Sequence, residues 1–544
     1  MFDPDRELRR FVICFAGCGD IGDDAAMNKP AGTPAFATWT GRLRQGAWAM
    51  LVLTIFALAS DIRSARGSWA VSYTFTNLTF AFPTCFVPEP RTNRLYVCEQ
   101  AGKIYFFTND PSVPGKTLFL DLSAVTQANN DCGLLGFAFH PEYGQAASTN
   151  RGYVYVYYCY SPTPTLTPDS STVMYDRLSR FTVPDGSLSA DPASELVLIN
   201  QFDRNFWHNG GGMFFGSDGF LYLANGDEGQ AFDFFNNSQI INSGFFSGIF
   251  RIDVDNNAAR SHPIRRHLQD RGGIPVGWPP TTNGNYMVPN DNPWLDPGGS
   301  VLEEFFAIGL RNPFHVTFDP PTGNIWAGDV GEAVEEEVDL IQRGGNYQWA
   351  YGEGSIPGPK PKPAALIGND TPPVYSYTHT PFTRCIIGGC VYRGAQFPSL
   401  TGLYFFGDFV AGRIWTLAYT GSSPAVVREL CALPTQVSLT AFGLDQSGEI
   451  YFCSYHEGKI LKLNQRPDAT PFVLSCTLVS NNQVRLSFTN FPGLSFSLVT
   501  ADDLTLPLTN WLWVEAATEN SPGNYGFTNR SITGAPAYYR VRQP

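Results

Sequence analysis

Short apolar runs, each bounded by turn-forming residues, set the pattern along most of this chain. In one unit, apolar residues at 213–215 and 220–224 lie on either side of Gly216-Ser217-Asp218-Gly219. These turn residues accept the positive φ angles of tight turns. Runs this short, with turn residues between them, are typical of β-strands and not of helices. The unit therefore predicts an antiparallel hairpin.

The same order of apolar strand, turn and aromatic strand recurs, so we predict an all-β chain with an internal repeat. Six irregular copies lie within residues 85–100, 134–158, 213–227, 314–329, 388–408 and 441–453. Their spacing of about 65 residues suits four-stranded propeller blades with insertions. We therefore expect a six-bladed β-propeller over residues 72–465. The Pro-, Gly- and Asn-rich segment at about 255–300 is expected to be a loop insertion at one rim.

Polar motifs flank the hairpins, and the hairpin ends of a propeller converge on one rim. If Phe215 pairs with Phe220, antiparallel register places His208 opposite Asp227, with Cβ atoms about 5 Å apart. A carboxylate there orients the imidazole and favours its cationic form. Taken alone, this stretch is more typical of a glycine-rich turn that carries a surface His–Asp pair.

The hairpin at 314–329 repeats this arrangement. Pairing across Pro321-Thr322 sets Arg311 opposite Glu332, which in isolation is a rim salt bridge worth under about 1 kcal/mol. The acidic residues within 335–339 are interpreted as a solvent-exposed face.

Both ends of the chain differ from this repeat. From Pro467 onward, alternating runs with Pro and Asn turns predict a small C-terminal β-sandwich-like accessory module over 467–544. Residues 1–70 are predicted to be a leader with a signal peptide, because the apolar run 47–59 follows Arg42 and Arg44 and is too short to span a bilayer. Small residues at 57–59 and at 68–70 both suit cleavage. We expect a secreted or periplasmic protein with no transmembrane anchor in the mature chain.

Composition excludes some partners and permits disulfides. The formal net charge is −13 and no basic run follows the leader, which argues against nucleic acid or an acidic membrane as a partner. Of the 11 Cys, none has zinc-ribbon spacing. Cys85 and Cys98 flank a turn, which is compatible with a cross-strand disulfide in an exported protein.

Four motifs in order resemble one known family, the glucose/sorbosone dehydrogenases, which are soluble PQQ-dependent sugar dehydrogenases. The match covers about residues 75–465. The motifs are Asp131-Cys132-Gly133-Leu134-Leu135-Gly136-Phe137-Ala138-Phe139-His140-Pro141, His208-Asn209-Gly210-Gly211-Gly212 with Asn225-Gly226-Asp227, Gly309-Leu310-Arg311-Asn312-Pro313, and Gly345-Asn346-Tyr347.

This resemblance implies a propeller that holds pyrroloquinoline quinone (PQQ) and Ca²⁺ over the channel mouth and passes electrons from a sugar to an external acceptor. It implies His208 as general base, Asp227 as its partner and Arg311 as the group that stabilises charge on the quinone. The remaining implied positions are Asn312 and Asp131 for the cofactor, and Gly331 and Glu332 for the metal. The cations that bind the PQQ carboxylates have no unambiguous match in this sequence, and Arg384, Arg393 and Arg413 are the nearby candidates for cofactor binding.

Two alternatives stay open beside the dehydrogenase. Enzymes of the family commonly have Gly-Pro where this chain has Gly331-Glu332, and the segment 328–331 with 336–341 also resembles the Hedgehog-interacting-protein branch, whose propeller binds partners. The first alternative is therefore a non-enzymatic propeller that binds carbohydrate or protein. The second is a Ca²⁺-dependent hydrolase or lactonase, since acid-rich funnels also suit that chemistry.

Overall fold

The computed structural model describes residues 69–465 apart from 166, 169–170, 381–382 and 422–423, together with strands of 475–542 and the dipeptide 13–14. The chain divides into two compact units, Trp69–Gln465 and Met1–Ser68 with Arg466–Pro544. The predicted leader core at 47–59 lies outside the described residues. The described residues contain no α-helix, and their only helical segment is the 3₁₀ turn η2 (Pro398–Leu400). No helix among the described residues is long and apolar enough to cross a membrane.

Within the described part of Trp69–Gln465, six sheets of four or more strands follow one another along the chain. The first three are β3 (Pro83–Pro88), β4 (Arg94–Glu99), β5 (Lys103–Thr108) and β6 (Thr117–Asp121); β7 (Leu134–Phe139), β8 (Tyr153–Tyr160), β9 (Met174–Thr182), β10 (Asp191–Asp203) and β15 (Thr282–Asn283); and β11 (Met213–Phe215), β12 (Leu221–Asn225), β13 (Gly248–Ile252), β17 (Phe305–Ile308), β21 (Gly345–Asn346) and β24 (Asn369–Asp370).

In the third sheet β21 pairs in parallel with β17 and β24, whereas the other three sheets are antiparallel throughout. They are β18 (Pro313–Asp319), β19 (Asn324–Asp329), β20 (Glu335–Ile341) and β25 (Tyr375–Thr378); β26 (Ile386–Ile387), β27 (Tyr404–Asp408), β28 (Arg413–Ala418) and β29 (Val426–Ala432); and β30 (Leu439–Leu444), β31 (Ile450–Ser454), β32 (Lys459–Gln465) and β2 (Trp69–Thr74). Two-residue strands form two small ribbons, β14 (Ser261–His262) with β16 (Val288–Pro289), and β22 (Gly352–Glu353) with β23 (Ile356–Pro357).

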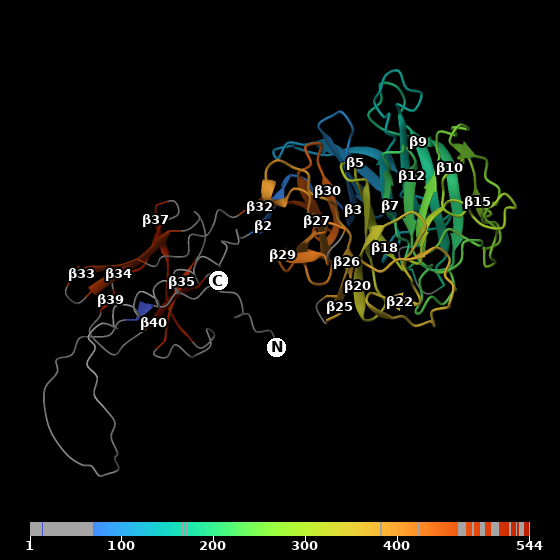
Figure 1. Cartoon of the computed structure of the whole chain (residues 1–544). Coiled ribbons are helices and arrows are strands. Elements are labelled where there is room, and N and C mark those ends of the chain that lie inside the picture. The colour runs from blue at the N-terminus through green and yellow to red at the C-terminus, as the bar shows by residue number, and fades with distance from the viewer. Residues whose placement is uncertain are drawn as a thin grey trace, which may run out of the picture. The chain divides into compact units, whose positions relative to one another are not determined.

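The first strand of each sheet contacts the first strand of the next. The contacts run β3 to β7, β7 to β11, β11 to β18, β18 to β26, β26 to β30 and β30 back to β3, and Figure 1 shows these strands within one body. The last sheet takes its outer strand from the other end of the unit, since β2 pairs with β32 from Trp69↔Gln465 to Thr74↔Ile460. The two ends of the unit therefore complete one sheet.

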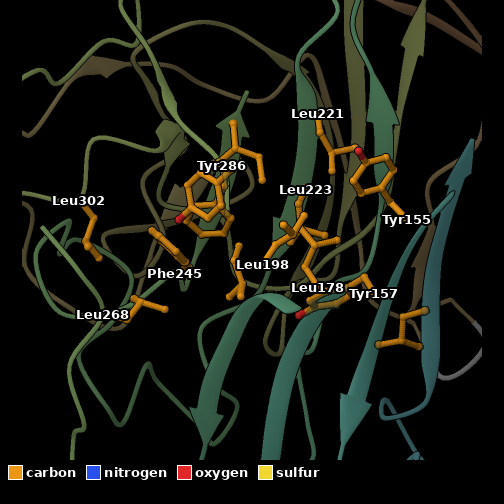
Figure 2. Packing of buried hydrophobic residues seen from close by; sticks show 14 of the residues in the cluster. Tyr155, Tyr157, Leu178, Leu198, Leu221, Leu223, Phe245, Leu268, Tyr286 and Leu302 are labelled. Carbon is orange, nitrogen blue, oxygen red and sulfur yellow. The ribbon is translucent and has the colours of Figure 1, made fainter. Parts of the chain in front are cut away.

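Apolar side chains fill the space between consecutive sheets. Tyr155 and Tyr157 of β8, Leu178 of β9 and Leu221 and Leu223 of β12 belong to one buried cluster, and Figure 2 shows them directed toward one another. Strands such as β8 are rich in Tyr and Val, which favour a pleated surface packed on both faces. Apolar and polar residues alternate only weakly in strands that are buried on both faces, and such strands are recognised in the sequence by their aromatic and β-branched residues instead.

The segment 255–300 runs mostly along an outer edge and not only at a rim. Its strand β15 pairs with β10, the fourth strand of the second sheet, and Figure 1 shows both strands at one side of the unit. Leu268 and Tyr286 from this segment are buried in the same cluster as β8. One side chain of the segment reaches the loop after the β11–β12 hairpin, where Arg271 Nη1 donates to Glu228 Oε2 at 2.8 Å.

The C-terminal strands form two sheets of their own. One holds β33 (Ser475–Ser480), β34 (Gln483–Thr489), β37 (Thr518–Ser521), β38 (Asn524–Gly526) and β39 (Arg530–Ser531), and the other holds β1 (Ile13–Cys14), β35 (Ser497–Ala501), β36 (Leu512–Ala516) and β40 (Tyr538–Arg542). Leu486 and Phe488 of β34 share a buried cluster with Leu498 of β35 and Tyr525 of β38. Apolar residues of both sheets thus form one core, as in a sandwich.

The His208 hairpin forms with a register one residue away from the prediction. Phe215 pairs with Leu221 and not with Phe220. The turn is longer than predicted, because the Gly216 N–H donates to the Phe220 carbonyl at 3.0 Å and the Gly219 N–H to the Gly216 carbonyl at 2.9 Å. Phe220 thus belongs to the turn.

The acidic run is buried, so its interpretation as a solvent-exposed face is wrong. Glu335, Glu336, Glu337 and Asp339 all have low exposure. They lie on β20, the third strand of a sheet whose second strand, β19, and fourth strand, β25, cover both of its edges. Packing by neighbouring sheets then removes the remaining solvent from the strand.

We predict that Leu463→Ala weakens closure of the unit. Leu463 is fully buried on β32, and Trp69 and Val71 of β2 pack against its cluster. Deleting such a side chain leaves a cavity that costs about 2–5 kcal/mol. The free energy of unfolding from urea titration checks this, with the exposed Ser72→Ala on β2 as control. An equal loss of unfolding free energy in Leu463→Ala and Ser72→Ala would contradict the view that buried packing between β2 and β32 stabilises the unit.

We predict that Glu304→Gln flattens the pH dependence of stability. Glu304 accepts from the Tyr286 hydroxyl at 2.8 Å, and burial raises its pKa to about 7. The unfolded chain releases this proton near pH 4.5, so folding stability falls as pH rises toward 7, by up to about 3 kcal/mol. Urea unfolding at pH 5 and pH 8 should show a smaller fall in Glu304→Gln. In the control variant Asp185→Asn, which changes an exposed carboxylate, the free energy of unfolding should fall between pH 5 and pH 8 as much as in the wild type.

Candidate active site

His208 and Asp227 form a direct, buried pair beyond the ends of the β11–β12 hairpin. His208 Nδ1 lies 2.6 Å from Asp227 Oδ1, and the carboxylate is fully buried. The one-residue shift in register does not separate the two side chains, because His208 and Asp227 lie beyond the last paired residues of the hairpin, Met213 and Leu223. Gly226 makes room for it, since a Cβ at this position would lie 2.2 Å from the His208 carbonyl oxygen. A side chain at position 226 would therefore push the His208 segment away from the segment that carries Asp227.

The surroundings of Asp227 fix which ring nitrogen carries the proton. Its Oδ1 also accepts the Gly229 N–H at 3.0 Å, and its Oδ2 accepts the Trp349 indole N–H at 2.8 Å. A carboxylate that accepts three donors favours the tautomer in which His208 Nδ1 donates. Within the described residues, His208 Nε2 has no hydrogen-bond partner. The pair therefore presents a free imidazole nitrogen.

A second carboxylate ties His208 to the neighbouring sheet. Asp131 Oδ2 accepts the His208 backbone N–H at 3.1 Å and the Asn312 side-chain N–H at 3.2 Å. Asn312 Oδ1 in turn accepts the Gly210 N–H at 3.3 Å. His208 itself has φ +63°, a conformation that costs about 1–3 kcal/mol in residues other than glycine. This network of hydrogen bonds holds that conformation in place.

Asp329 positions Arg311 and Asn312 through their backbone. Its two oxygens accept the Arg311 N–H at 2.8 Å and the Asn312 N–H at 2.7 Å. The Asp227 N–H also donates to the Arg311 carbonyl at 2.9 Å. Loops that follow or precede three sheets therefore meet at one point. Burial raises the pKa of Asp329 to about 7, although both backbone donors act against this shift.

The Arg311 guanidinium is almost fully engaged. Its Nε and Nη2 lie 3.0 and 2.9 Å from Glu332 Oε2, as the hairpin pairing predicts. Its Nη1 donates to the carbonyls of Val330 and Gly331 at 2.9 and 2.8 Å. Its Cζ lies 5.5 Å from the centre of the Trp349 ring. A guanidinium has five N–H donors, so one on Nη2 is left.

The structure does not bring all the predicted residues together. His208, Asp227, Arg311, Asn312 and Asp131 share one network, and Gly331 and Glu332 join it through Arg311. Two predicted residues lie apart. Arg393 pairs with Asp319 at the opposite end of β18 from Pro313. Arg413 pairs with Glu429 of the outer strand β29 at 2.6 Å.

Sequence reasoning missed Trp349 and a buried acidic cluster. Trp349 lies two residues after the Gly345-Asn346-Tyr347 motif, and this closeness to the motif is the sequence feature that could have marked it as a site residue. The cluster consists of Asp329, Glu337 and Asp339, whose ligand atoms all lie within 4.8 Å of one another. Neither Asp339 oxygen has a hydrogen-bond partner among the described residues. Burial raises the pKa of Glu337 and Asp339 well above the usual range.

Exposed aromatic side chains surround this polar network. Trp207 precedes His208 and is 40% exposed, and Phe232, 58% exposed, lies beside Glu332 because its N–H is 3.5 Å from Glu332 Oε2. Phe82 is 46% exposed and packs 4.8 Å from the Tyr455 ring. Exposed rings beside a buried polar site suit a ligand with both apolar and polar faces.

Sequence relatives fall into two groups. The HIPL1 protein of Arabidopsis thaliana is 30% identical over 377 residues, which are 60% of this chain and 51% of that protein. The Hedgehog-interacting protein of Homo sapiens is 25% identical over 400 residues, 68% of this chain and 49% of that protein. Quinoprotein glucose dehydrogenase B of Acinetobacter calcoaceticus is 25% identical over 259 residues, 47% of this chain and 48% of that protein. The chain spans about half the length of these curated relatives.

Solved structures show the same fold. A crystal structure of glucose dehydrogenase aligns with a TM-score of 0.54 at 18% identity, over 72% of this chain and 99% of that one. The apo form of the soluble aldose sugar dehydrogenase of Escherichia coli aligns with a TM-score of 0.51 at 18% identity, over 73% of this chain and 100% of that one.

A family match covers most of the larger unit. Residues 81–274 and 281–462 match the sequence family described as glucose/sorbosone dehydrogenase. The matched ranges contain every member of the His208 network. The chain therefore belongs to the glucose/sorbosone dehydrogenase family.

Proposed function

We propose that this protein is an exported dehydrogenase that oxidises a sugar hydroxyl with PQQ and Ca²⁺. On this proposal, unit Trp69–Gln465 is a six-bladed β-propeller, supported by its six sheets and the closed circuit of first-strand contacts. The observation that carries the chemistry is the buried His208–Asp227 pair with Nε2 left free. Electrons would leave to an external acceptor.

His208 acts as general base in this proposal. Its Nε2 takes the proton of the sugar hydroxyl, while Asp227 holds Nδ1–H and stabilises the imidazolium that forms. A positioned histidine supplies about 10²–10⁴-fold in rate. Trp349 and the Gly229 N–H keep Asp227 in place through their hydrogen bonds, so they are positioning groups.

Arg311 supplies fixed positive charge next to the base. Its remaining Nη2 N–H can donate to an oxygen that gains negative charge, and the groups that hold the guanidinium prevent it from reorganising. PQQ, when bound, supplies the hydride acceptor for this site. Its acidic groups need cations, and Arg384 fits better than Arg393 or Arg413. Arg384 is exposed. Burial raises the pKa of the neighbouring Cys385 thiol, and the charge of the nearby Arg311 acts against this shift.

Ca²⁺ fits the acidic cluster better than the predicted site. At Gly331 and Glu332, the Gly331 carbonyl and the Glu332 carboxylate already accept donors from Arg311, and a second cation there would be repelled. Asp339 instead offers two buried oxygens with no hydrogen-bond partner among the described residues, and the oxygens of Asp329 and Glu337, although they accept backbone N–H groups, lie beside it. Carboxylate oxygens are ligands that Ca²⁺ prefers. We propose that these three residues hold the ion, which would neutralise Asp339 and support the Arg311 loop through Asp329.

A partner-binding propeller is the second candidate. Two of the relatives described above carry Hedgehog-interacting or HIPL names, and Arg311 holds the carbonyls that would otherwise face a metal. In this case the aromatic side chains around the mouth would contact a protein or a glycan. The C-terminal strands would serve as an accessory module in either case.

We predict PQQ-dependent dye reduction that requires His208. Purified protein is reconstituted with PQQ and Ca²⁺ and assayed with a panel of aldoses. His208→Ala should lower kcat by about 10²–10⁴-fold, because the general base is lost. The exposed His267→Ala, whose ring is hydrogen-bonded to Asn283 at 3.1 and 3.3 Å and lies outside the His208 network, should keep wild-type rates. Failure of every sugar would remove the dehydrogenase proposal, and activity that survives His208→Ala would remove His208 as base.

We predict that Ca²⁺ raises the thermal midpoint of unfolding and that Asp339→Asn abolishes this rise. An ion that binds only the folded state raises the free energy of unfolding by an amount that grows with the logarithm of its concentration over Kd. Differential scanning fluorimetry with and without Ca²⁺ measures the rise. The exposed Asp370→Asn should respond as the wild type does. An equal rise in Asp339→Asn would exclude the acidic cluster as the binding site.

A further inference from the structure

Two buried thiols meet directly behind the segment that carries His208. Cys132 precedes β7 and Cys159 lies on β8, and both are fully buried in the same cluster. The Cys159 N–H donates to the Gly133 carbonyl at 2.9 Å, which brings the two backbones together. Burial raises the pKa of the Cys132 thiol, and the nearby Cys159 thiol adds to this shift. The two thiols, both free in the structure, therefore share one buried cluster on backbone segments that are hydrogen-bonded to each other.

The Cys132 side of this pair is linked to the candidate site through two neighbouring contacts. The Cys132 thiol donates to the Phe206 carbonyl at 3.2 Å, two residues before His208. The adjacent Asp131 accepts the His208 N–H. Consecutive residues of one loop therefore hold the His208 segment from two points.

The loop before Cys132 is conformationally strained. Asn129 and Asn130 are exposed and have φ angles of +136° and +49°, which non-glycine residues rarely adopt. Gln100 fixes the loop from outside, because its Nε2 donates to the carbonyls of Asn130 and Cys132 at 2.8 Å. A covalent tie from Cys132 to β8 would secure the loop from inside.

We propose that Cys132 and Cys159 form a disulfide that ties the Asp131 loop to β8. The two thiols lose two protons and two electrons, and the S–S bond forms. A small-molecule disulfide such as oxidised glutathione accepts them and leaves as two thiols. The bond removes the donor that Cys132 provides to Phe206, so the His208 segment would then depend on Asp131 alone.

Burial determines when this bond can form. Neither sulfur is exposed in the folded chain, and burial raises the pKa of the Cys132 thiol above its usual range. The thiolate that starts exchange is therefore scarce once the loop has closed. The bond forms before or during closure of the loop and is afterwards protected from reductant.

The test maps the thiols of the full chain after refolding with oxidised and reduced glutathione. The protein is denatured without reductant, alkylated, digested and analysed by mass spectrometry. The expected result is a peptide pair joined through Cys132 and Cys159, with neither residue alkylated. The wild-type chain alone suffices for this step, so a variant that fails to fold does not impair it.

A second measurement tests the mechanical role. The urea midpoint of unfolding should rise on oxidation in the wild type and in Cys390→Ser, a buried thiol outside the pair. The rise should be absent in Cys132→Ser. Alkylation of both Cys132 and Cys159 in the oxidised sample would overturn the proposal, and so would a glutathione adduct on either residue without the cross-link.

Discussion

The pairing of β2 with β32 is the constraint on which the candidate site depends. Three consecutive sheets, those that begin with β7, β11 and β18, contribute residues to the His208 network, and no single sheet could form it. First strands contact one another in sequence around the unit, and this circuit returns to β3 only through the sheet that β2 completes. A strand from the beginning of the unit thus holds its end. Stability and site geometry are therefore linked through a region far from the chemistry.

The site itself is an arrangement of carboxylates that hold other groups. Asp227 fixes an imidazole, Asp131 fixes a backbone N–H and an amide, and Asp329 fixes the backbone of Arg311 and Asn312. Each is buried or half-buried, and each gains hydrogen bonds in exchange for lost hydration. Because the donors are mostly backbone N–H groups, the arrangement keeps little freedom. Such rigidity is what electrostatic catalysis requires.

Much of this could be predicted from the sequence, and the failures have physical causes. Local patterns gave the hairpins, the repeat and the meeting of His208 with Asp227, because turn residues and strand pairing act over short distances. The register was wrong by one residue because Phe220, an apolar residue, belongs to the turn. The acidic run was misread because burial on β20 comes from neighbouring sheets. Arg393 and Arg413 were candidates for the cofactor because they lie near the motifs in the sequence, without a motif of their own, and in the structure they form ion pairs with Asp319 and Glu429.

Strand β2 also limits how the predicted leader could be processed. Trp69 begins this strand, pairs with Gln465 and packs its ring 5.0 Å from the ring of Phe397. A protease that cut after residue 70 would remove this tryptophan and shorten the strand that completes the last sheet. A cut after residue 59 would leave strand β2 whole. Maturation of the chain and integrity of the fold are therefore compatible at the earlier of the two small-residue sites.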